Sequence, residues 1–139
     1  MNYQDILQIL KNKLLFSDSS IEKLKKFHDM LILANKRYNL ISKNSEKDIW
    51  LRHILDSAQI VQYINNDVKN ISDFGSGAGF PGAIIAVFDV KKRFHMKLYE
   101  KSPVKRSFLK EISNKLSIKV QIFGNIYEDS IDSDYIVSR

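Results

Sequence analysis

The spacing of apolar residues changes near residue 68 and divides the sequence into two parts. Before this point, apolar residues recur at helical intervals, as Ile6, Leu10 and Leu14 do. The pattern predicts three helices: over residues 3–15, from a capping box at residues 19–22 to residues 35–39, and from residue 45 to about residue 64. The first part of the chain is therefore expected to be entirely helical.

After residue 68 the pattern alternates between short apolar strands and helices, as it does in parallel α/β sheets. Strands are predicted over residues 71–74, 93–100 and 118–122 and from residue 134, with helices from about Pro81 and over residues 103–116. The residues expected to point inward from the last helix are Val104, Phe108, Leu109, Ile112 and Leu116. We predict an α/β fold with a helical extension over residues 1–67 and a Rossmann-like core over residues 68–139, in which the fourth strand lies beside the first.

A glycine-rich turn follows the first predicted strand and is the main candidate for chemistry. Residues 73–82 read D-F-G-S-G-A-G-F-P-G, with glycines at every second position from Gly75 to Gly79. Glycine permits positive φ and has no Cβ, so a ligand can lie against the backbone there. The start of the next helix adds N–H groups and the positive end of a dipole. This arrangement predicts a nucleotide or nucleoside site, and the alternative is a structural turn without a ligand.

The turn can be read in two registers that favour different ligands. Residues 77–82 satisfy G-x-G-x-x-G, the dinucleotide pattern, but Gly75 already occupies the place directly after the strand. The second register places Asp73 two residues before the alternating glycines. A carboxylate beside the ligand would repel a pyrophosphate and attract a cation. The turn therefore favours S-adenosylmethionine, which carries a sulfonium, over a nicotinamide cofactor.

A second acid, Glu100, ends the next predicted strand. In a doubly wound sheet this position adjoins the first glycine turn, and an acid there accepts the ribose hydroxyls. The alternative role is a charge at the start of the helix that follows Ser102-Pro103. With the glycine turn, Glu100 indicates a nucleoside that has free ribose hydroxyls.

Composition and charge narrow the classes of partner. The 139 residues include no Cys and carry a net charge of +6. Residues 91–119 hold ten Lys or Arg against two acids, a balance of +8, which is either a solvated helix face or a surface for RNA phosphates. No apolar run is long enough for a bilayer and the N-terminus lacks a basic signal region, so we expect a cytoplasmic protein without a membrane partner. The sequence carries no signal for an oligomeric state.

Several segments together resemble one known family. Residues 35–42 read N-K-R-Y-N-L-I-S, residues 52–57 read R-H-I-L-D-S, the glycine turn ends in Pro-Gly, residues 105–109 read K-R-S-F-L, and the chain ends in Ser-Arg. This combination is similar to the glucose-inhibited division protein B family, the ribosomal RNA small subunit methyltransferase G enzymes. The resemblance implies methyl transfer from S-adenosylmethionine to N7 of a guanine in 16S rRNA.

The resemblance also implies the residues of the site. Together with Gly77 and Glu100 from the motif analysis, the expected cofactor contacts are Gly75, Phe80, Ile126, Tyr127 and Arg139. His53 and Asp56 are expected near the pocket mouth, although a packed core histidine is an equal alternative for His53. Because guanine N7 already has a free lone pair, no catalytic base is required, and no catalytic or metal-ligating residue is assigned.

Family members continue beyond the Ser-Arg segment, so the resemblance implies a C-terminally truncated chain with an incomplete sheet, marginally folded and inactive as it stands.

Two other functions remain open. A non-catalytic RNA-binding protein would keep the basic surface without needing the glycine turn. A nicotinamide-dependent oxidoreductase would share the turn but would explain neither Asp73 nor the basic run.

Overall fold

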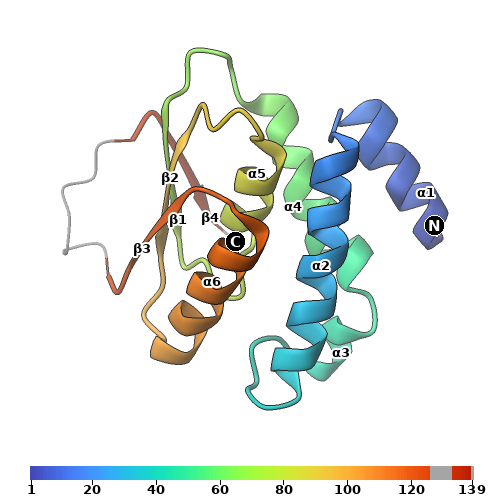
Figure 1. Cartoon of the computed structure of the whole chain (residues 1–139), viewed down its shortest axis with the longest axis vertical. Coiled ribbons are helices and arrows are strands. Elements are labelled where there is room, and N and C mark those ends of the chain that lie inside the picture. The colour runs from blue at the N-terminus through green and yellow to red at the C-terminus, as the bar shows by residue number, and fades with distance from the viewer. Residues whose placement is uncertain (126–132, 139) are drawn as a thin grey trace.

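The N-terminal part of the protein is helical, as predicted. The computed structural model describes residues 1–125 and 133–138. The helical segments of this part are α1 (Tyr3–Gln8), η1 (Ile9–Lys13), α2 (Asp18–Asn35), α3 (Lys43–Glu46), η2 (Trp50–Leu55), α4 (Asp56–Ala58) and η3 (Gln59–Tyr63). They form one side of the molecule in Figure 1, with α2 as the long helix that faces the rest of the fold.

The C-terminal part is a parallel sheet with two helices, which confirms the α/β class. Its strands are β1 (Asn70–Phe74), β2 (His95–Tyr99), β3 (Val120–Phe123) and β4 (Tyr135–Ser138), and its helices are α5 (Gly82–Phe88) and α6 (Pro103–Leu116). The strand order is β3-β2-β1-β4, and each neighbouring pair is parallel. The first strand is therefore central, with the fourth beside it as expected. The carboxyl ends of the strands all meet at one edge.

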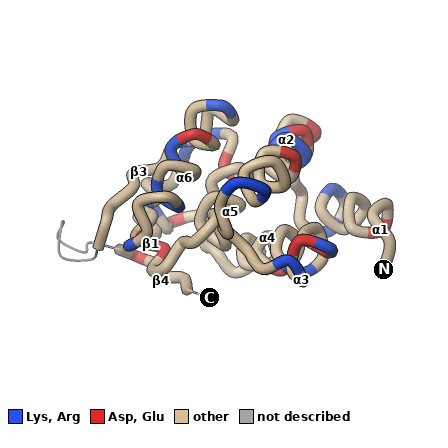
Figure 2. The backbone as a smooth tube through the Cα atoms, turned by 90° about the horizontal axis from the view of Figure 1, so that it is seen from below, with Lys and Arg blue, Asp and Glu red and all other residues tan. Residues whose placement is uncertain are grey.

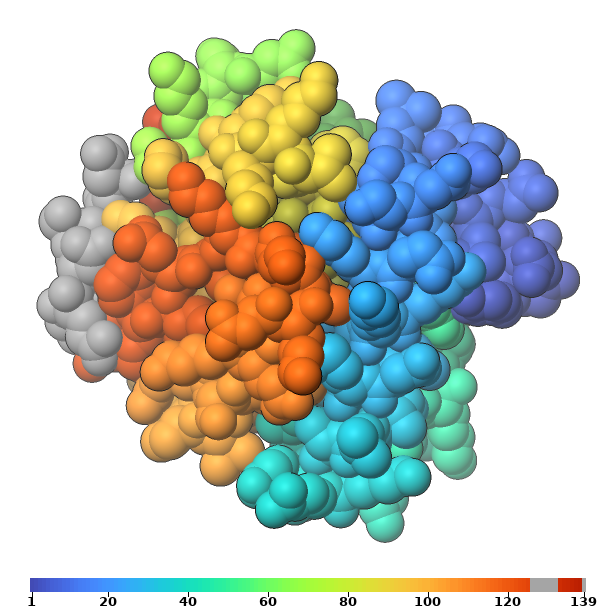
Figure 3. Space-filling view, in the orientation of Figure 1, coloured from blue at the N-terminus to red at the C-terminus, as the bar shows by residue number. Residues whose placement is uncertain are grey.

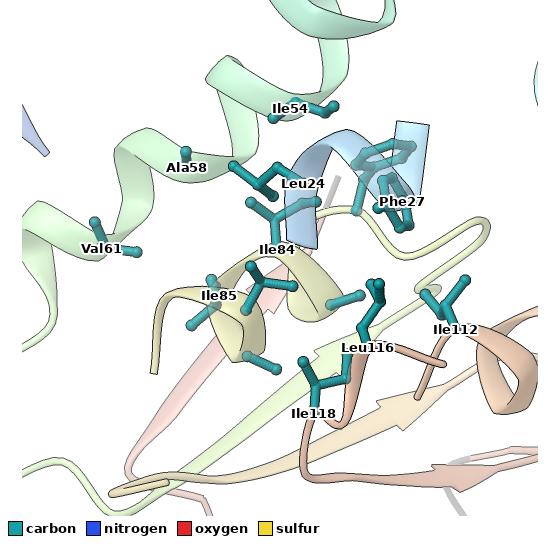
Figure 4. Close-up of a cluster of buried hydrophobic side chains, with 14 of the residues drawn as sticks. Leu24, Phe27, Ile54, Ala58, Val61, Ile84, Ile85, Ile112, Leu116 and Ile118 are labelled. Carbon is teal, nitrogen blue, oxygen red and sulfur yellow. The ribbon is translucent and has the colours of Figure 1, made fainter. Parts of the chain in front are cut away.

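The described helices cover one face of this sheet and share a single core with it (Figure 1). Leu24 and Phe27 from α2 point toward Ile84 of α5 and Ile112 of α6 (Figure 4). All four side chains are fully buried. The predicted boundary at residue 67 thus separates two patterns in the sequence, while the hydrophobic core runs across it. The division into an extension and a core stays a prediction about organisation along the chain.

Three details of the helical prediction were wrong. Helix α2 begins two residues earlier, because Ser17 rather than Ser19 caps it by accepting from the Ser20 N–H. The predicted third helix is interrupted by a turn at residues 47–48, after which η2, α4 and η3 follow one another without a gap. A bond of 2.6 Å from Asn35 Nδ2 to Glu46 Oε2 joins α3 to the end of α2. Val104 does not point into the core and is 42% exposed.

One aspartate joins the start of β4 to the start of β1. Asp134 Oδ2 accepts hydrogen bonds from the backbone N–H groups of Lys69 at 2.8 Å and Asn70 at 3.1 Å. These two bonds favour the charged carboxylate, so they lower the pKa of Asp134 below its ordinary value of 3.8. The carboxylate therefore stabilises the pairing of two strands that are far apart in the sequence.

We expect Asp134→Ala to lower the free energy of unfolding near neutral pH. A carboxyl whose pKa is depressed on folding stabilises the fold above its unfolded pKa, and this contribution is lost as the pH falls through the folded pKa. The difference between wild type and variant should therefore shrink below about pH 4. Urea unfolding at several pH values measures it. Asp67→Ala, which removes an exposed carboxylate in the preceding turn, is the matched control, and an equal loss in both variants would contradict the assignment.

Candidate functional site

A cavity of about 360 Å³ lies at the carboxyl ends of the first three strands. It is lined by Phe74, Gly75, Tyr99, Glu100, Lys101, Gly124 and Asn125. In open α/β sheets, ligands bind in the crevice outside this edge, and the volume lies within the roughly 300–1,000 Å³ of small-molecule sites. The cavity brings together two predicted site residues, Gly75 and Glu100, from different strands.

The three alternating glycines adopt the conformations expected of them. Gly75, Gly77 and Gly79 have φ values of 75°, 57° and 115°. A Cβ added to Gly75 or Gly77 would meet no atom within 4 Å, whereas one on Gly79 would lie 2.9 Å from the Cβ of Ala83. The first two glycines therefore leave open space beside the backbone, as a ligand seat requires. The third glycine serves close packing between the turn and α5.

Most N–H groups of the turn are bonded within the protein. Gly75 N and Ser76 N donate to the Tyr99 carbonyl at 2.9 and 3.1 Å, and Gly77 N donates to Glu100 Oε1 at 2.8 Å. Gly79 N and Phe80 N donate to the Ser76 carbonyl. A phosphate group normally takes up such N–H groups itself. The turn is thus built to hold its own shape and offers few donors to an anion.

Asp73 has a role other than the one predicted from the glycine register. Its side chain is completely buried beneath the turn, and Oδ2 accepts from the Gly82 N–H at 2.9 Å. The carboxylate therefore holds the start of α5 against the end of β1. The N–H of Gly82, the first residue of α5, is engaged by this bond, so this one of the N–H groups at the helix start is not available to a ligand.

Glu100 lies at the end of β2 and connects the cavity to the turn. Its Oε1 accepts from Gly77 N, and its Oε2 accepts from Ser102 N at 2.8 Å. Ionised carboxylate oxygens offer about four acceptor positions in all, so each oxygen keeps capacity for a further donor such as a ribose hydroxyl. The sequence identified the residue, and the structure adds that it fixes the central glycine.

Phe80 is placed by rings on both sides. It is 6% exposed, its ring stacks on His53 with centroids 4.8 Å apart, and it meets Phe27 edge-on at 5.4 Å. His53 is half-buried and Asp56 is exposed. Phe80 therefore ties the glycine turn to the N-terminal helices. Its predicted contact with the cofactor, and those of Gly75, Gly77 and Glu100, stay predictions. Ile126, Tyr127 and Arg139 lie outside the described residues.

An aromatic row, formed by Phe74, Tyr99 and Phe123, was missed by the sequence analysis. These three residues hold equivalent positions in β1, β2 and β3. The Tyr99 ring stacks on Phe123 at 5.1 Å and meets Phe74 edge-on at 5.3 Å. The Tyr99 hydroxyl is buried and has no hydrogen-bond partner among the described residues. The sequence shows that each of these strands ends in an aromatic residue. Only the register of the strands shows that the three rings lie side by side.

The basic run at residues 91–119 is not one surface, contrary to what its length along the sequence suggested. Lys91 precedes β2 and Lys119 precedes β3, so both lie at the amino ends of the strands. Lys101, which lines the cavity, and Lys105, in the first turn of α6, lie toward the opposite edge, where β2 ends. Arg106 is used internally, because its Nη1 donates to the carbonyls of Glu100 at 2.8 Å and Lys101 at 2.7 Å.

Further cations lie on the side of the molecule that carries the carboxyl ends of the strands. Figure 2 views the molecule from the side of the carboxyl ends and shows Lys and Arg at the end of α2, around α3 and along α6. Those of the first two segments are Lys36, Arg37, Lys43 and Lys47. The predicted helical extension therefore supplies part of the positive charge on the side of the molecule where the carboxyl ends of the strands lie, which the charge count for residues 91–119 did not indicate.

Within the described residues, no group of three or more His, Asp or Glu side chains is placed to hold a metal ion. No helix in the same part of the chain is long and apolar enough to cross a membrane.

A parallel sheet with an alternating-glycine turn after its first strand and an acid after its second defines a Rossmann-like fold of the methyltransferase type. The chain belongs to the rRNA small subunit methyltransferase G family, whose sequence model matches residues 20–139. This confirms the resemblance found in the motifs.

Individual relatives agree with this membership. The chain is 42% identical over 108 residues to the ribosomal RNA small subunit methyltransferase G of Rickettsia bellii (strain OSU 85-389), covering 78% of the chain and 55% of that protein. It is 38% identical over 137 residues to the protein of the same name from Pelagibacter ubique, covering 94% of the chain and 64% of that protein. The protein of the same name from Bartonella tribocorum is 34% identical over 142 residues, covering 99% of the chain and 65% of that protein. The chain thus spans between 55% and 65% of the length of these three relatives.

Gly82→Ala should destabilise the protein strongly. The added Cβ would contact Leu98 and lie 2.6 Å from Asp73 Oδ2, so it would displace the buried carboxylate from the Gly82 N–H. We expect the free energy of unfolding to fall by at least 1–3 kcal/mol, which is about the cost of overpacking a core. Gly77→Ala is the control: its Cβ enters open space and costs about 1–2 kcal/mol for the left-handed backbone alone. Denaturant unfolding that gives the same or a smaller loss for Gly82→Ala would contradict this account.

Proposed function

We propose that the chain binds S-adenosylmethionine in the cavity at the ends of β1, β2 and β3. We further propose that the protein of this family transfers a methyl group there to N7 of a guanine in 16S rRNA. The observation that carries the proposal is Glu100, which bonds Gly77 and lines the cavity with free acceptor capacity. Because ribosomal RNA is the substrate, we infer a cytoplasmic location.

The residues present fit a nucleoside cofactor. The open sides of Gly75 and Gly77 let a ligand approach the backbone, and Glu100 is placed to accept the ribose hydroxyls. Tyr99 and Phe74 give the cavity an apolar wall suited to an adenine ring. The resemblance adds Phe80, Ile126, Tyr127 and Arg139 as further contacts.

The glycine turn also discriminates against a dinucleotide. A pyrophosphate needs unpaired N–H donors, and five N–H groups of this turn, those of Gly75, Ser76, Gly77, Gly79 and Phe80, are bonded internally. S-adenosylmethionine has no phosphate, so the geometry supports it over a nicotinamide cofactor.

The proposed reaction asks little of the protein beyond placement. S-adenosylmethionine, when bound, supplies an electrophilic methyl group. The N7 lone pair of guanine is free, so no side chain has to remove a proton. Holding the two reactants in line and excluding water can supply roughly 7–11 kcal/mol of the barrier. The rigid turn, fixed by Asp73 below and Glu100 beside it, is suited to this task.

The position of N7 on the guanine base limits which guanines of the RNA the protein could methylate. Guanine N7 lies on the major-groove edge of the base, and the major groove of A-form RNA is too deep and narrow for a protein to reach. The target guanine is therefore expected to be unpaired or distorted. Lys101 at the cavity and the cations of α2, α3 and α6 on the same side of the molecule are available to bind phosphates of the RNA.

Calorimetry with S-adenosylhomocysteine tests the cofactor. Glu100→Ala should weaken binding by roughly 1.5–3 kcal/mol, because the ribose loses a charged acceptor and Gly77 loses its anchor. Gly77→Val should abolish binding by filling the open side of the turn. Glu100→Gln, which keeps one acceptor oxygen, should fall between wild type and Glu100→Ala.

Circular dichroism melts on the same variants separate loss of the site from loss of the fold. NADH serves as the competing ligand and is expected not to bind. Unchanged affinity for S-adenosylhomocysteine in both Glu100→Ala and Gly77→Val would refute the assignment. RNA binding without any binding of S-adenosylhomocysteine would favour a non-catalytic RNA-binding protein.

The division of the basic run predicts which lysines bind RNA phosphates. Replacing Lys101 and Lys105 with Gln should reduce the slope of log affinity against log salt by about 0.7 for each phosphate of single-stranded RNA that is no longer neutralised. Replacing Lys91 and Lys119, at the opposite edge, is the matched control and should leave the slope unchanged. Fluorescence anisotropy across a salt series measures both pairs, and equal slopes for the two double variants would sink the prediction.

A further inference from the structure

A second pocket of about 360 Å³ lies between the end of α2 and the first half of α6. Figure 3 shows the surface hollowed between the orange-coloured α6 and the cyan end of α2. On the α6 side, Val104, Ser107, Phe108 and Glu111 line it, and their spacing places them on one face of the helix. Arg37 and Tyr38 line it from the other side.

The walls of this pocket combine an apolar floor with polar edges. Phe108 is buried at the bottom, while Val104 is 42% and Tyr38 44% exposed at the lip. Ser107 and Glu111 are exposed polar groups on one side, and the Arg37 guanidinium lies 5.4 Å from the centre of the Tyr38 ring. A flat heteroaromatic ring could stack on Tyr38, donate an amino group to Glu111 and place a phosphate beside Arg37.

The lip that carries Arg37 and Tyr38 is held in place from beneath. The side chain of Asn35 is 8% exposed. Its Oδ1 accepts from Leu40 N at 2.9 Å and Ile41 N at 3.0 Å, and its Nδ2 donates to Glu46. Asn35 thus closes the loop after α2 at both ends. These bonds fix the path of the backbone that carries Arg37 and Tyr38.

The pocket is adjacent to the candidate cofactor cavity. Lys101 lines the cofactor cavity and Pro103 lines the second pocket, so only Ser102 lies between the two along the chain. Arg106 holds this turn by donating to the carbonyls of Glu100 and Lys101. An RNA strand whose target base enters the cofactor cavity would therefore pass the second pocket within a short distance.

We propose that this second pocket binds one unpaired base of the substrate RNA close to the methylated guanine. The preferred base offers Glu111, which only accepts hydrogen bonds when ionised, an exocyclic amino group that reaches beyond the ring edge, whereas uracil offers only its ring N3–H. Adenine, cytosine and guanine meet this condition and uracil does not. The proposal rests on the proposed function for its choice of RNA, and it adds a subsite outside the cofactor cavity.

The test uses fluorescently labelled oligoadenylate and oligouridylate of equal length and the 139-residue chain. Stacking on an aromatic side chain contributes to binding for every base, so Tyr38→Ala should weaken both oligonucleotides by roughly 5- to 100-fold. Tyr38→Phe should restore binding to within about twofold, since it keeps the ring. Tyr63→Ala removes another exposed tyrosine, which belongs to η3 and does not line the pocket. It is the matched control and should bind as wild type does.

Two further variants separate stacking from charge and from base recognition. Tyr38→Ala should leave the salt slope unchanged, whereas Arg37→Gln should reduce it by about 0.7. Glu111→Gln should narrow the preference for oligoadenylate over oligouridylate. S-adenosylhomocysteine affinity, measured on the same proteins, should not change in any of them, so failure of the cofactor assignment would show in wild type and would be distinct from failure of the subsite.

Four results would overturn the proposal: no binding of either oligonucleotide to wild type at low salt, equal affinities for wild type and Tyr38→Ala, the same loss in Tyr63→Ala, or no preference between the two oligonucleotides. Sedimentation that shows a dimer dissociated by Tyr38→Ala would also overturn it, since the pocket would then bind a second copy of the chain.

Discussion

The hydrogen bond between the buried carboxylate of Asp73 and the N–H of Gly82 fixes the path of the chain from the central strand into α5. The site depends on this bond, because the glycine turn is the segment that it spans. Gly82 can approach so closely only because it has no side chain. With the base of the turn fixed, Gly75 and Gly77 face open space, and the carboxylate of Glu100 can hold the turn from the side.

The N-terminal helices support this turn as well as the sheet does. Phe80 leaves the turn and lies against His53 and Phe27, which come from η2 and α2. His53, one of the residues of the family's R-H-x-x-D-S segment, therefore acts on the turn through a ring contact. This explains how a helical segment that is remote in the sequence can affect a site at the edge of the sheet. It also explains why the hydrophobic core is continuous across residue 67.

The carboxyl edge of the sheet gathers groups with different tasks. Phe74 and Tyr99 of the aromatic row and the carboxylate of Glu100 line the candidate cofactor cavity. The short turn from Lys101 to Pro103 separates this cavity from the pocket beside α2. Arg106, one of the cations of the basic run, holds that turn through its Nη1. A basic residue within a run of positive charge can thus have a structural role, and its hydrogen bonds reveal that role.

The sequence by itself determined the elements and the chemistry of the turn. The apolar periods predicted the α/β class, Ser102-Pro103 gave the start of α6, and the alternating glycines gave the positive φ values. These features are local, so neighbouring residues are enough to predict them. Tertiary structure alone decided that Asp73 lies under the turn, that Glu100 bonds a glycine 23 residues away, and that the basic run is split between two edges. It also decided that Tyr38 faces α6 across a pocket. Each of these depends on which distant segments pack together, and the spacing of residues along the chain does not contain that information.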